Sequence, residues 1–393
     1  MTVHAVDDYA GAMAVLKNPH MHQALYDEGS VVMADVLLTL HGEAHQRRRI
    51  AEFSVFGRGF FRHYEREVFP ATLQPVLEPH LNTGEADLVD LCYRVVMNLT
   101  ADFAGLDRDD TPEETATLLG LVKTFSAGAT LAHSTQDRAA VRRRVEDAMA
   151  VLDNRFLQRS IARRRALLAA GADLPNDILA TLLAKADRVP LDPDVLRREI
   201  AFYLQAGAHS TANATVHAFD ELCRWCSDDI SRREQLTSDR VLLQRAVHES
   251  LRLHPASPVA QRRATEDATI DRHSIAAGDL VVVDLARANR DPAVFGADAD
   301  RFDPGREIPQ GTWPFGLTFG YGTHACLGRD LDGGVAPKTS AEPAELQMGI
   351  VPMLVHTLLK HGAAPIAGHP PQKDANTTRE HFATYPIAFG ARP

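Results

Sequence analysis

The spacing of apolar residues predicts a protein that is mostly helical. Between Leu88 and Leu106, apolar side chains recur every three or four residues, which is the period of a helix with one buried face. The same spacing predicts helices over residues 142–168 and 348–359. It also predicts one from Asp192 to about Trp225, roughly 50 Å long at the usual rise per residue. A short apolar run at Val281–Val283 predicts a strand, so we expect a small sheet component.

Polar residues, prolines and glycines mark where these elements begin and end. Thr111, followed by a proline and two acids, is a helix start, and Pro175–Asp177 predicts the start of a shorter helix. Residues 289–306 are rich in Asp, Pro and Gly, which predicts a loop. Near the C-terminus, Gly333–Pro337 predicts an interruption in a helix that resumes around Ala344.

Composition and charge exclude several classes of function. The 393 residues are 45% hydrophobic and 24% charged, as in a globular protein with a sizeable core. The net charge of −10 argues against nucleic-acid binding, and no apolar run approaches the ~20 residues of a membrane span. The first residues do not resemble a signal peptide. Because no repeat or linker divides the chain, we expect one domain over residues 1–393, in the cytoplasm and without nucleic-acid or membrane partners.

Four cysteines are too few and too scattered for a disulfide framework. Cys223 and Cys226 form a C-x-x-C pattern inside a predicted helix with no second pair, so we expect them to pack on one helix face. Cys326 differs because it lies in the segment Phe319–Gly328, where three glycines let the backbone bend sharply and lie close to a flat ligand. A helix start and backbone N–H groups beside Cys326 would stabilise a thiolate, which is a ligand for haem iron.

This segment resembles the haem-binding loop of the cytochrome P450 family. The resemblance implies a mostly α fold with small β-sheets, in which haem b (iron protoporphyrin IX) lies between a long distal helix and a proximal cysteine loop. It also implies that Cys326 is the axial iron ligand and that Phe319, His324 and Gly328 border the haem. The alternative is a glycine-rich turn with an incidental buried cysteine.

A second motif follows in the order that the family shows. Glu249 and Arg252 lie three residues apart and share one helix face, and Phe302–Arg306 precedes the cysteine loop. By the resemblance, Glu249, Arg252 and Arg306 form a structural ion network behind the haem.

Haem propionates need cationic or hydrogen-bonding partners once they are buried. His45 and Arg49 lie four residues apart on one predicted helix face, and together with Arg262 they match the family positions that supply such partners. We expect Arg47 and Arg48 to form a solvated basic face, which could help an acidic electron donor to dock.

The long helix departs from the family pattern within Ala206–Thr211. A glycine at position 207 costs up to about 1 kcal/mol relative to alanine, and the resemblance explains it by a local distortion that makes room for dioxygen. Where the family usually has an acid and then a threonine, this chain has His209 and Ser210. A hydroxyl can donate and accept, and histidine titrates near neutrality, so we expect these two residues to relay protons in catalysis.

The leading hypothesis is a haem-thiolate monooxygenase that inserts one oxygen atom from O2 into a small apolar molecule. Electrons would come from a separate ferredoxin-type donor with its reductase, since the sequence shows no fused flavin or iron–sulfur domain. Two alternatives remain: a peroxide-using or rearrangement-catalysing haem-thiolate enzyme with an altered proton relay, and a non-catalytic haem-binding sensor or carrier. The residues that the resemblance places around the substrate are Met33, Val36, Leu37, Phe125, Gln205, Ala206, Ala256, Val259, Phe382 and Tyr385.

Overall fold

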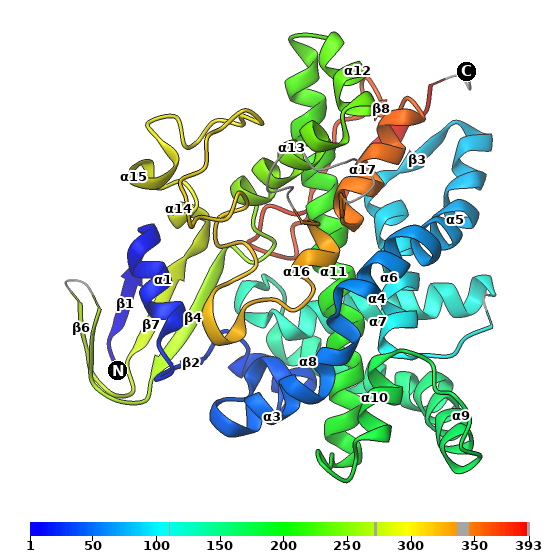
Figure 1. The fold of residues 1–393 in the computed structure, drawn as a ribbon, viewed down its shortest axis with the longest axis vertical. Helices are drawn as coiled ribbons and strands as arrows, with labels where there is room; N and C mark the ends of the chain where they lie inside the picture. Colours follow the sequence, from blue (N-terminus) through cyan, green and yellow to red (C-terminus); the bar gives the residue numbers. More distant parts are fainter. Residues whose placement is uncertain (110, 271–272, 336–345, 391–393) are drawn as a thin grey trace.

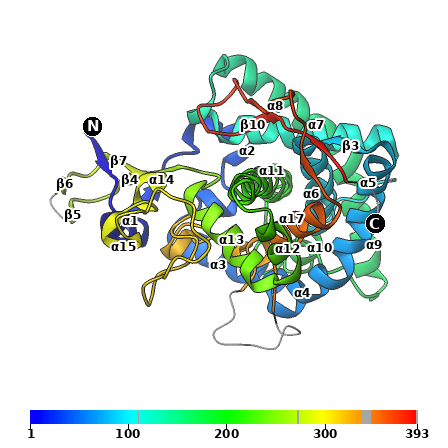
Figure 2. The same cartoon turned by 90° about the horizontal axis from the view of Figure 1, so that it is seen from above.

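The helices of the protein gather around one long central helix. The structure is a computed structural model that describes residues 1–109, 111–270, 273–335 and 346–390. The central helix, α11 (Pro193–Ser227), passes through the middle of the molecule (Figure 1), and Figure 2 shows it nearly end-on with other helices around it. The helices before it are α1 (Tyr9–Lys17), α2 (Ser30–Met33), α3 (Gly42–Glu52), α4 (Arg58–His63), α5 (Phe69–Thr83), α6 (Leu88–Ala104), α7 (Pro112–Ala129), α8 (Arg138–Leu152), α9 (Gln158–Ala169) and α10 (Ile178–Ala184). Those after it are α12 (Ser231–Ser238), α13 (Arg240–Leu253), α14 (Leu285–Ala288), α15 (Pro292–Phe295), α16 (Arg329–Asp332) and α17 (Ile350–Lys360).

The start of α11 is fixed by local chemistry, and its sides are covered by other helices. The Asp192 side chain accepts a hydrogen bond from the Asp194 N–H at 2.8 Å, and Pro193 occupies the first turn. Its apolar side chains pack against α6, α7, α13 and α17, so the helix is buried on several sides. The helix predicted from Asp192 is therefore confirmed.

Close packing explains the glycine inside α11. A Cβ at Gly207 would lie 2.5 Å from Cγ2 of Thr100 on α6, which is closer than real Cβ contacts allow. The helix runs through this position without interruption. Contact with α6, rather than the expected distortion, is thus the structural reason for glycine here.

The largest sheet lies to one side of the helices, in the strand order β1-β7-β4-β2. Strand β1 is parallel to β7, and the other two pairs are antiparallel. Val281 and Val283 of β7 are fully buried in a cluster with Val15 of α1, which lies on this sheet (Figure 1). The strands are β1 (Val3–Val6), β2 (Met21–Gln23), β3 (Glu85–Asp87), β4 (Val259–Ala264), β5 (Ala268–Ile270), β6 (His273–Ile275), β7 (Leu280–Asp284), β8 (Ala364–Pro365), β9 (Gln372–Lys373), β10 (Phe382–Thr384) and β11 (Pro386–Ala388).

The predicted helices are present, with boundaries shifted by local chemistry. The helix predicted over residues 88–106 ends at Ala104, because Gly105 takes a left-handed φ of +89°. The helix predicted over 142–168 begins earlier, because the Asp137 side chain caps it, and a π turn joins α8 to α9. Helix α17 begins after Gly349, whose φ is +86°.

The C-terminal third agrees with the sequence prediction at one position and differs from it at another. The predicted loop over residues 289–306 contains a short helix, α15, which Asp291 caps. Helix α16 stops at Asp332, immediately before Gly333, as the glycine pair predicted. Ala344, where helix was expected to resume, lies outside the described residues.

Two kinds of site are absent from the part of the chain that the structure describes. None of the helices there is both long and apolar enough to cross a membrane. Nor do these residues bring three or more His, Cys, Asp or Glu side chains together so that they could hold a metal ion. Cys223 and Cys226 are unpaired on α11, where burial raises the pKa of Cys223 to about 12.

Candidate functional site

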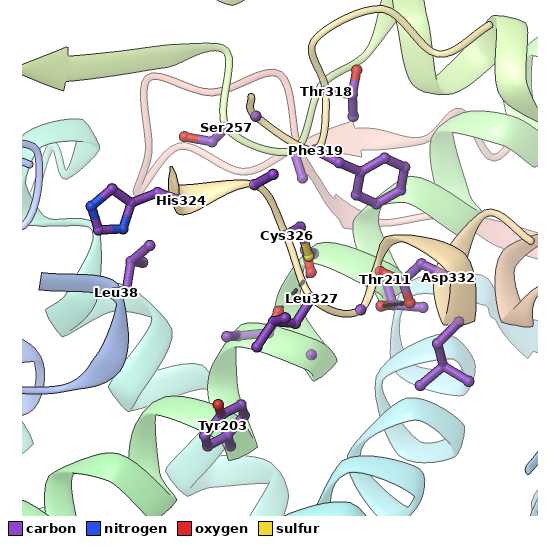
Figure 3. A pocket seen from close by; sticks show the side chains of 18 of the residues that line it. Leu38, Tyr203, Thr211, Ser257, Thr318, Phe319, His324, Cys326, Leu327 and Asp332 are labelled. Carbon is purple, nitrogen blue, oxygen red and sulfur yellow. Dashed lines mark hydrogen bonds between the residues drawn. The ribbon is translucent and has the colours of Figure 1, made fainter. Parts of the chain in front are cut away.

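A cavity of about 340 Å³ lies between α11 and the segment that carries Cys326 (Figure 3). Most of its walls are apolar side chains, including those from α6, α11, α17 and β4. In Figure 3, Cys326 lies near the middle, with His324 toward one end and Asp332 toward the other. The cavity therefore places one thiol in an apolar enclosure between an imidazole-bearing end and a carboxyl-bearing end.

The loop around Cys326 is held by glycines and by backbone hydrogen bonds. The Cys326 N–H donates to the Phe319 carbonyl oxygen at 2.8 Å. Gly320 and Gly322 have φ values of +68° and +69°, and a Cβ at Gly322 would lie 2.7 Å from the Leu16 carbonyl oxygen. Glycine is therefore required at position 322, both by the backbone conformation and by the close contact with α1.

The protein alone does not hold the Cys326 thiol as a thiolate. Enclosure by the surrounding protein raises its pKa to about 11, although the thiol is exposed to the cavity, and the nearby Asp332 adds to the rise. The Gly328 N–H, Arg49 and Arg329 oppose the rise but do not cancel it. The expected stabilisation by the following helix start is thus outweighed by burial, and a bound metal would be needed to ionise the thiol.

Four side chains form one end of the cavity: His45 and Arg49 of α3, Arg262 of β4, and His324. The His45 and His324 rings lie 4.5 Å apart between centroids, and Arg49 donates to the Ala325 carbonyl oxygen at 2.9 Å. His45 Nε2 and His324 Nδ1 are buried without a hydrogen-bond partner among the described residues. Because unpaired buried polar atoms are costly, this end is suited to a ligand that brings its own acceptors.

Burial and neighbouring cations lower the pKa values at this end of the cavity. The pKa of His324 falls to about 2 and that of Arg262 to about 10, mainly through burial. Anionic groups placed here would oppose these shifts, because they favour the charged forms. The sequence reasoning missed His41, whose ring lies 5.1 Å from that of His324 and stacks on His22 at 3.8 Å between centroids. The signal that could have found it is its position four residues before His45.

Behind the cysteine loop, Glu249, Arg252 and Arg306 come together as the sequence grouped them. Arg252 donates to the two carboxylate oxygens of Glu249 at 2.7 and 2.8 Å, and Arg306 donates to Glu249 Oε1 at 3.0 Å. All three side chains are buried, and Arg252 is 0% exposed. Arg306 also pairs with Asp298 at 2.8 Å, a contact that the sequence did not indicate.

Asn289 connects this network to the cysteine loop. Its carbonyl oxygen accepts from Arg252 at 2.6 Å, and its side-chain oxygen accepts from the Leu317 N–H at 2.7 Å. Its side-chain amide donates to Thr318 Oγ1 at 3.1 Å. A Cβ at Gly316 would lie 2.2 Å from Asn289 Oδ1, so glycine is required there. No local spacing in the sequence points to this role of Asn289.

Comparisons with known proteins agree with this geometry. A sequence profile described as Cytochrome P450 matches residues 121–331, more than half of the chain. The chain belongs to the cytochrome P450 family. It is 39% identical over 141 residues to EryCII, a cytochrome P450 family protein of Saccharopolyspora erythraea, and the match covers 36% of each chain. It is 32% identical over 284 residues to linalool 8-monooxygenase of Pseudomonas putida, covering 70% of this chain and 59% of that relative.

The overall arrangement also matches solved cytochrome P450-like structures. The structure of CalO2 aligns with a TM-score of 0.78 at 23% identity, over 98% of this chain and 90% of that one. At this level of identity the likeness supports the fold alone. The mostly helical fold with small sheets is thus confirmed, while the curated relatives are matched over only part of their length.

Cytochrome P450 proteins hold haem b, and the cavity of this chain fits that group. Cys326 would bind the iron, and the apolar walls would contact the macrocycle. His45, Arg49, Arg262 and His324 would bind the two propionates. The observation that carries this fit is the pair of unpartnered imidazole nitrogens beside two guanidinium groups at one end of an otherwise apolar cavity.

His209 and Ser210, the two residues expected to relay protons, are placed differently on α11. Ser210 lines the cavity, and its hydroxyl donates to the carbonyl oxygen one helical turn earlier at 2.6 Å. His209 is not part of the lining: its Nδ1 lies 2.6 Å from the Tyr93 hydroxyl, and its ring lies 5.1 Å from that of His381. Burial lowers the pKa of His209 well below its ordinary value, so this imidazole is neutral. The two residues therefore lie on different sides of the helix surface.

Fewer residues contact the cavity than the resemblance named. Four of the proposed substrate residues line the cavity, as do Phe319 and Gly328; these four are Leu37, Ala206, Ala256 and Val259. The other six are buried in the structure outside that lining: Met33, Val36, Phe125, Gln205, Phe382 and Tyr385. Large lining side chains that the sequence reasoning missed are Tyr26, Leu38, Phe202 and Tyr203.

Arg48 does not belong to a solvated basic face. Arg47 is exposed, but Arg48 is buried and donates to Glu199 of α11. Glu199 also accepts from the Leu37 N–H at 3.0 Å, so it holds a cavity-lining segment. The expectation was wrong for Arg48 because its partner lies 151 residues away in the sequence.

A second carboxyl lies beside this ion pair. Glu52 of α3 accepts from the Tyr203 hydroxyl at 2.5 Å, and Tyr203 borders the cavity. Burial raises the pKa of Glu52 well above its ordinary value, with Glu199 adding to the rise. Burial also raises the pKa of Glu199 to about 7, although Arg48 opposes this. The pair of carboxyls therefore holds a proton at pH values where exposed glutamates are ionised.

Proposed function

We propose that this chain is a haem-thiolate monooxygenase that inserts one oxygen atom from O2 into a small apolar molecule. The single observation that carries the proposal is the Cys326 thiol at an apolar cavity that also holds a cluster of imidazole and guanidinium groups at one end and the Ser210 hydroxyl. The bound haem would supply the activation of dioxygen. One relative, linalool 8-monooxygenase, carries this type of activity in its name.

The residues of the chain would have separate tasks in this reaction. Cys326 binds the cofactor iron, and the apolar side chains of α6 and α11 exclude bulk water and favour an apolar substrate. Ser210 is the hydroxyl on the α11 wall that can hold or pass a proton inside the cavity. His209 lies on the side of α11 that faces away from the cavity. We assign it two roles: it orients α11 through its hydrogen bond with Tyr93, and it passes protons to the cavity through Ser210 or ordered water.

We also propose the surroundings in which the reaction takes place. Electrons come from a ferredoxin-type donor with its reductase; the exposed Arg47, Arg58 and Arg62 on α3 and α4 would suit an acidic partner. Residues 1–393 act as one domain, since the cavity is lined by residues from Leu16 to Val351. A cytoplasmic location is consistent with four unpaired cysteines.

A second candidate function follows from the α11 wall. The Ser210 hydroxyl is engaged with its own helix and His209 faces away from the cavity, so proton delivery to dioxygen is less direct than an acid–hydroxyl pair would make it. An enzyme that takes peroxide, or that catalyses a rearrangement, does not need that delivery. We therefore retain a peroxide-using or rearranging haem-thiolate enzyme as the alternative, with a haem-binding sensor or carrier as the outcome if no turnover is found.

Two measurements test the proposal in sequence. The reduced protein with carbon monoxide should absorb near the wavelength characteristic of thiolate-ligated haem, and Cys326→Ala should abolish that band while the matched control Cys223→Ala keeps it. Persistence of the band in Cys326→Ala would show that another residue binds the iron.

Small apolar molecules that shift the Soret band of the ferric protein are then tested for product with a ferredoxin system and with peroxide. Product only with peroxide favours the alternative, and product with neither favours a sensor or carrier.

A further inference from the structure

The end of the cavity opposite His324 contains a half-buried carboxyl group. Asp332 is the last residue of α16, six positions beyond Cys326, and its side chain lines the cavity. Its Oδ1 accepts a hydrogen bond from the Thr211 hydroxyl of α11 at 2.7 Å, and Figure 3 shows the two side chains together. Thr211 is 1% exposed and also lines the cavity. The pair therefore links the cysteine-loop wall to the α11 wall inside the enclosed site.

The surroundings of Asp332 favour its neutral form near neutrality. Burial raises its pKa to about 7, and the hydrogen bond from Thr211 opposes the rise. Among the described residues, no basic side chain forms an ion pair with Asp332. Its neighbour Asp330 instead pairs with Arg329 at 2.9 Å, and the nearby Glu65 accepts from the backbone N–H groups of residues 348 and 349.

We propose that Asp332 sets the reduction potential of the iron bound by Cys326 and makes that potential dependent on pH. An ionised carboxylate in the cavity would place negative charge on the thiolate side of the site, where low dielectric makes the interaction strong. That charge favours the ferric form, so it lowers the potential. When an external donor adds one electron to the iron, the Asp332 carboxylate becomes more basic and takes up one proton from solvent.

Geometry supports this coupling beyond the charge state alone. Asp332 and Cys326 both line the cavity, and Asp332 ends the short helix that follows the cysteine loop, so the carboxyl faces the space in which the iron would be bound. Thr211 is a positioning residue: its hydroxyl stabilises the carboxylate relative to the acid, so it sets the pH at which the proton leaves. The imidazoles of His45 and His324 lie at the other end and can add their own pH dependence, which the variants below separate.

The test is an anaerobic spectroelectrochemical titration of the haem-loaded protein between about pH 5.5 and 8.5. In the parent, the midpoint potential should fall as the pH rises through about 7. Asp332→Asn should raise the potential at high pH and remove this fall, by roughly a tenfold change in the reduction equilibrium, or about 59 mV for one electron. The matched control is Asp330→Asn, which removes the same charge two residues away and should leave the pH dependence intact.

Thr211→Val provides an independent variant, because it keeps the shape of the side chain but removes the hydroxyl. The transition in its potential should move to higher pH, since the carboxylate loses its donor. An unchanged slope in Asp332→Asn overturns the proposal, as does loss of the slope in Asp330→Asn. Should Asp332→Asn not retain haem, an unshifted transition in Thr211→Val overturns it instead. The inference rests on haem binding at Cys326 and not on the proposed monooxygenation, because no substrate or oxidant is present in the measurement.

Discussion

Buried acidic and basic side chains lie behind both walls of the cavity, but bases outnumber acids behind one wall and acids outnumber bases behind the other. Behind the cysteine loop, one carboxylate, Glu249, meets the guanidinium groups of Arg252 and Arg306. Behind α11, two carboxyls, Glu52 and Glu199, lie beside a single guanidinium group. Glu249 accepts hydrogen bonds on both oxygens, whereas Oε1 of Glu52 has no partner among the described residues.

This difference separates a fixed wall from a wall that responds to protons. The cysteine loop is tied to the Glu249 network through Asn289, so its position depends on a fully paired ion cluster. Burial raises the pKa values of the two carboxyls behind α11, so this wall loses protons as the pH rises toward and above neutrality. We therefore expect substitutions behind the cysteine loop to affect folding and haem retention, and substitutions behind α11 to affect the response to pH.

The largest effect is expected from Glu249→Ala. Removing the carboxylate leaves Arg252 buried without its ion-pair partner, a loss on the order of 3–5 kcal/mol for a buried pair. Because domains are stable by only about 5–15 kcal/mol, the variant should misfold or fail to retain haem. The measurement is the ratio of haem to protein after purification, with the urea midpoint of any soluble material.

Glu43→Ala is the matched control for this variant. Glu43 and Arg47 also form a glutamate–arginine pair on a helix, but both side chains are exposed and their charged atoms lie 3.6 Å apart. Exposed pairs contribute at most about 1 kcal/mol, so this variant should retain haem normally. Normal recovery of haem-loaded Glu249→Ala would show that the buried network is not what holds the cysteine loop.

A smaller and opposite effect is expected from Glu52→Gln. The pKa of Glu52 is raised in the folded protein, so its contribution to stability is present at low pH and is lost as the pH rises toward and above neutrality. Glutamine stays neutral and can still accept from the Tyr203 hydroxyl. The variant should therefore be more stable than the parent at about pH 8, by roughly 1–2 kcal/mol, and its urea midpoint should vary less with pH.

Glu199→Gln distinguishes the two members of the carboxyl pair. It leaves Arg48 buried without a charged partner at pH values above about 7, where Glu199 is ionised, so it should destabilise the protein there, whereas Glu52→Gln should stabilise it. If Glu52→Gln is instead less stable than the parent at about pH 8, the second carboxyl is ionised there and the contrast between the two walls fails.

The sequence predicted the parts of this structure whose contacts are local or carried by a motif. Glu249 and Arg252 share one turn of a helix, and the glycines around Cys326 are adjacent in the chain, so spacing alone indicates them. Asp332 and Thr211 meet across 121 residues, and no helical or strand period relates them. The helix starts were predictable for the same reason as the local motifs, because a capping side chain and the N–H group that it accepts from lie two or three positions apart.

The cavity lining was harder to predict than the core. The resemblance indicates which segments surround the substrate but not which of their side chains face it, and Met33 and Phe125 are both 0% exposed without bordering the cavity. Tyr203 shows the converse: it lines the cavity while its hydroxyl reaches Glu52 on α3. Such a choice of surface depends on how α3 and α11 pack, which single-sequence patterns do not contain.

The smallest effect is expected at Ser210, where the α11 wall offers one hydroxyl to the cavity. Ser210→Ala removes a hydrogen bond made within its own helix, so the stability should change by no more than about 0.5 kcal/mol. If the protein uses dioxygen, product formed per electron consumed should fall by about two- to tenfold, with the balance lost as hydrogen peroxide. This is less than the 10²–10⁴-fold effect of a directly placed proton donor, because water can replace the hydroxyl.

His209→Asp should preserve or improve coupling, since an acid there can still accept from Tyr93. Coupling that is tight in the parent and unchanged in Ser210→Ala would remove the relay from this wall, and unchanged peroxide-driven product formation together with little donor-driven turnover would favour the peroxide-using enzyme.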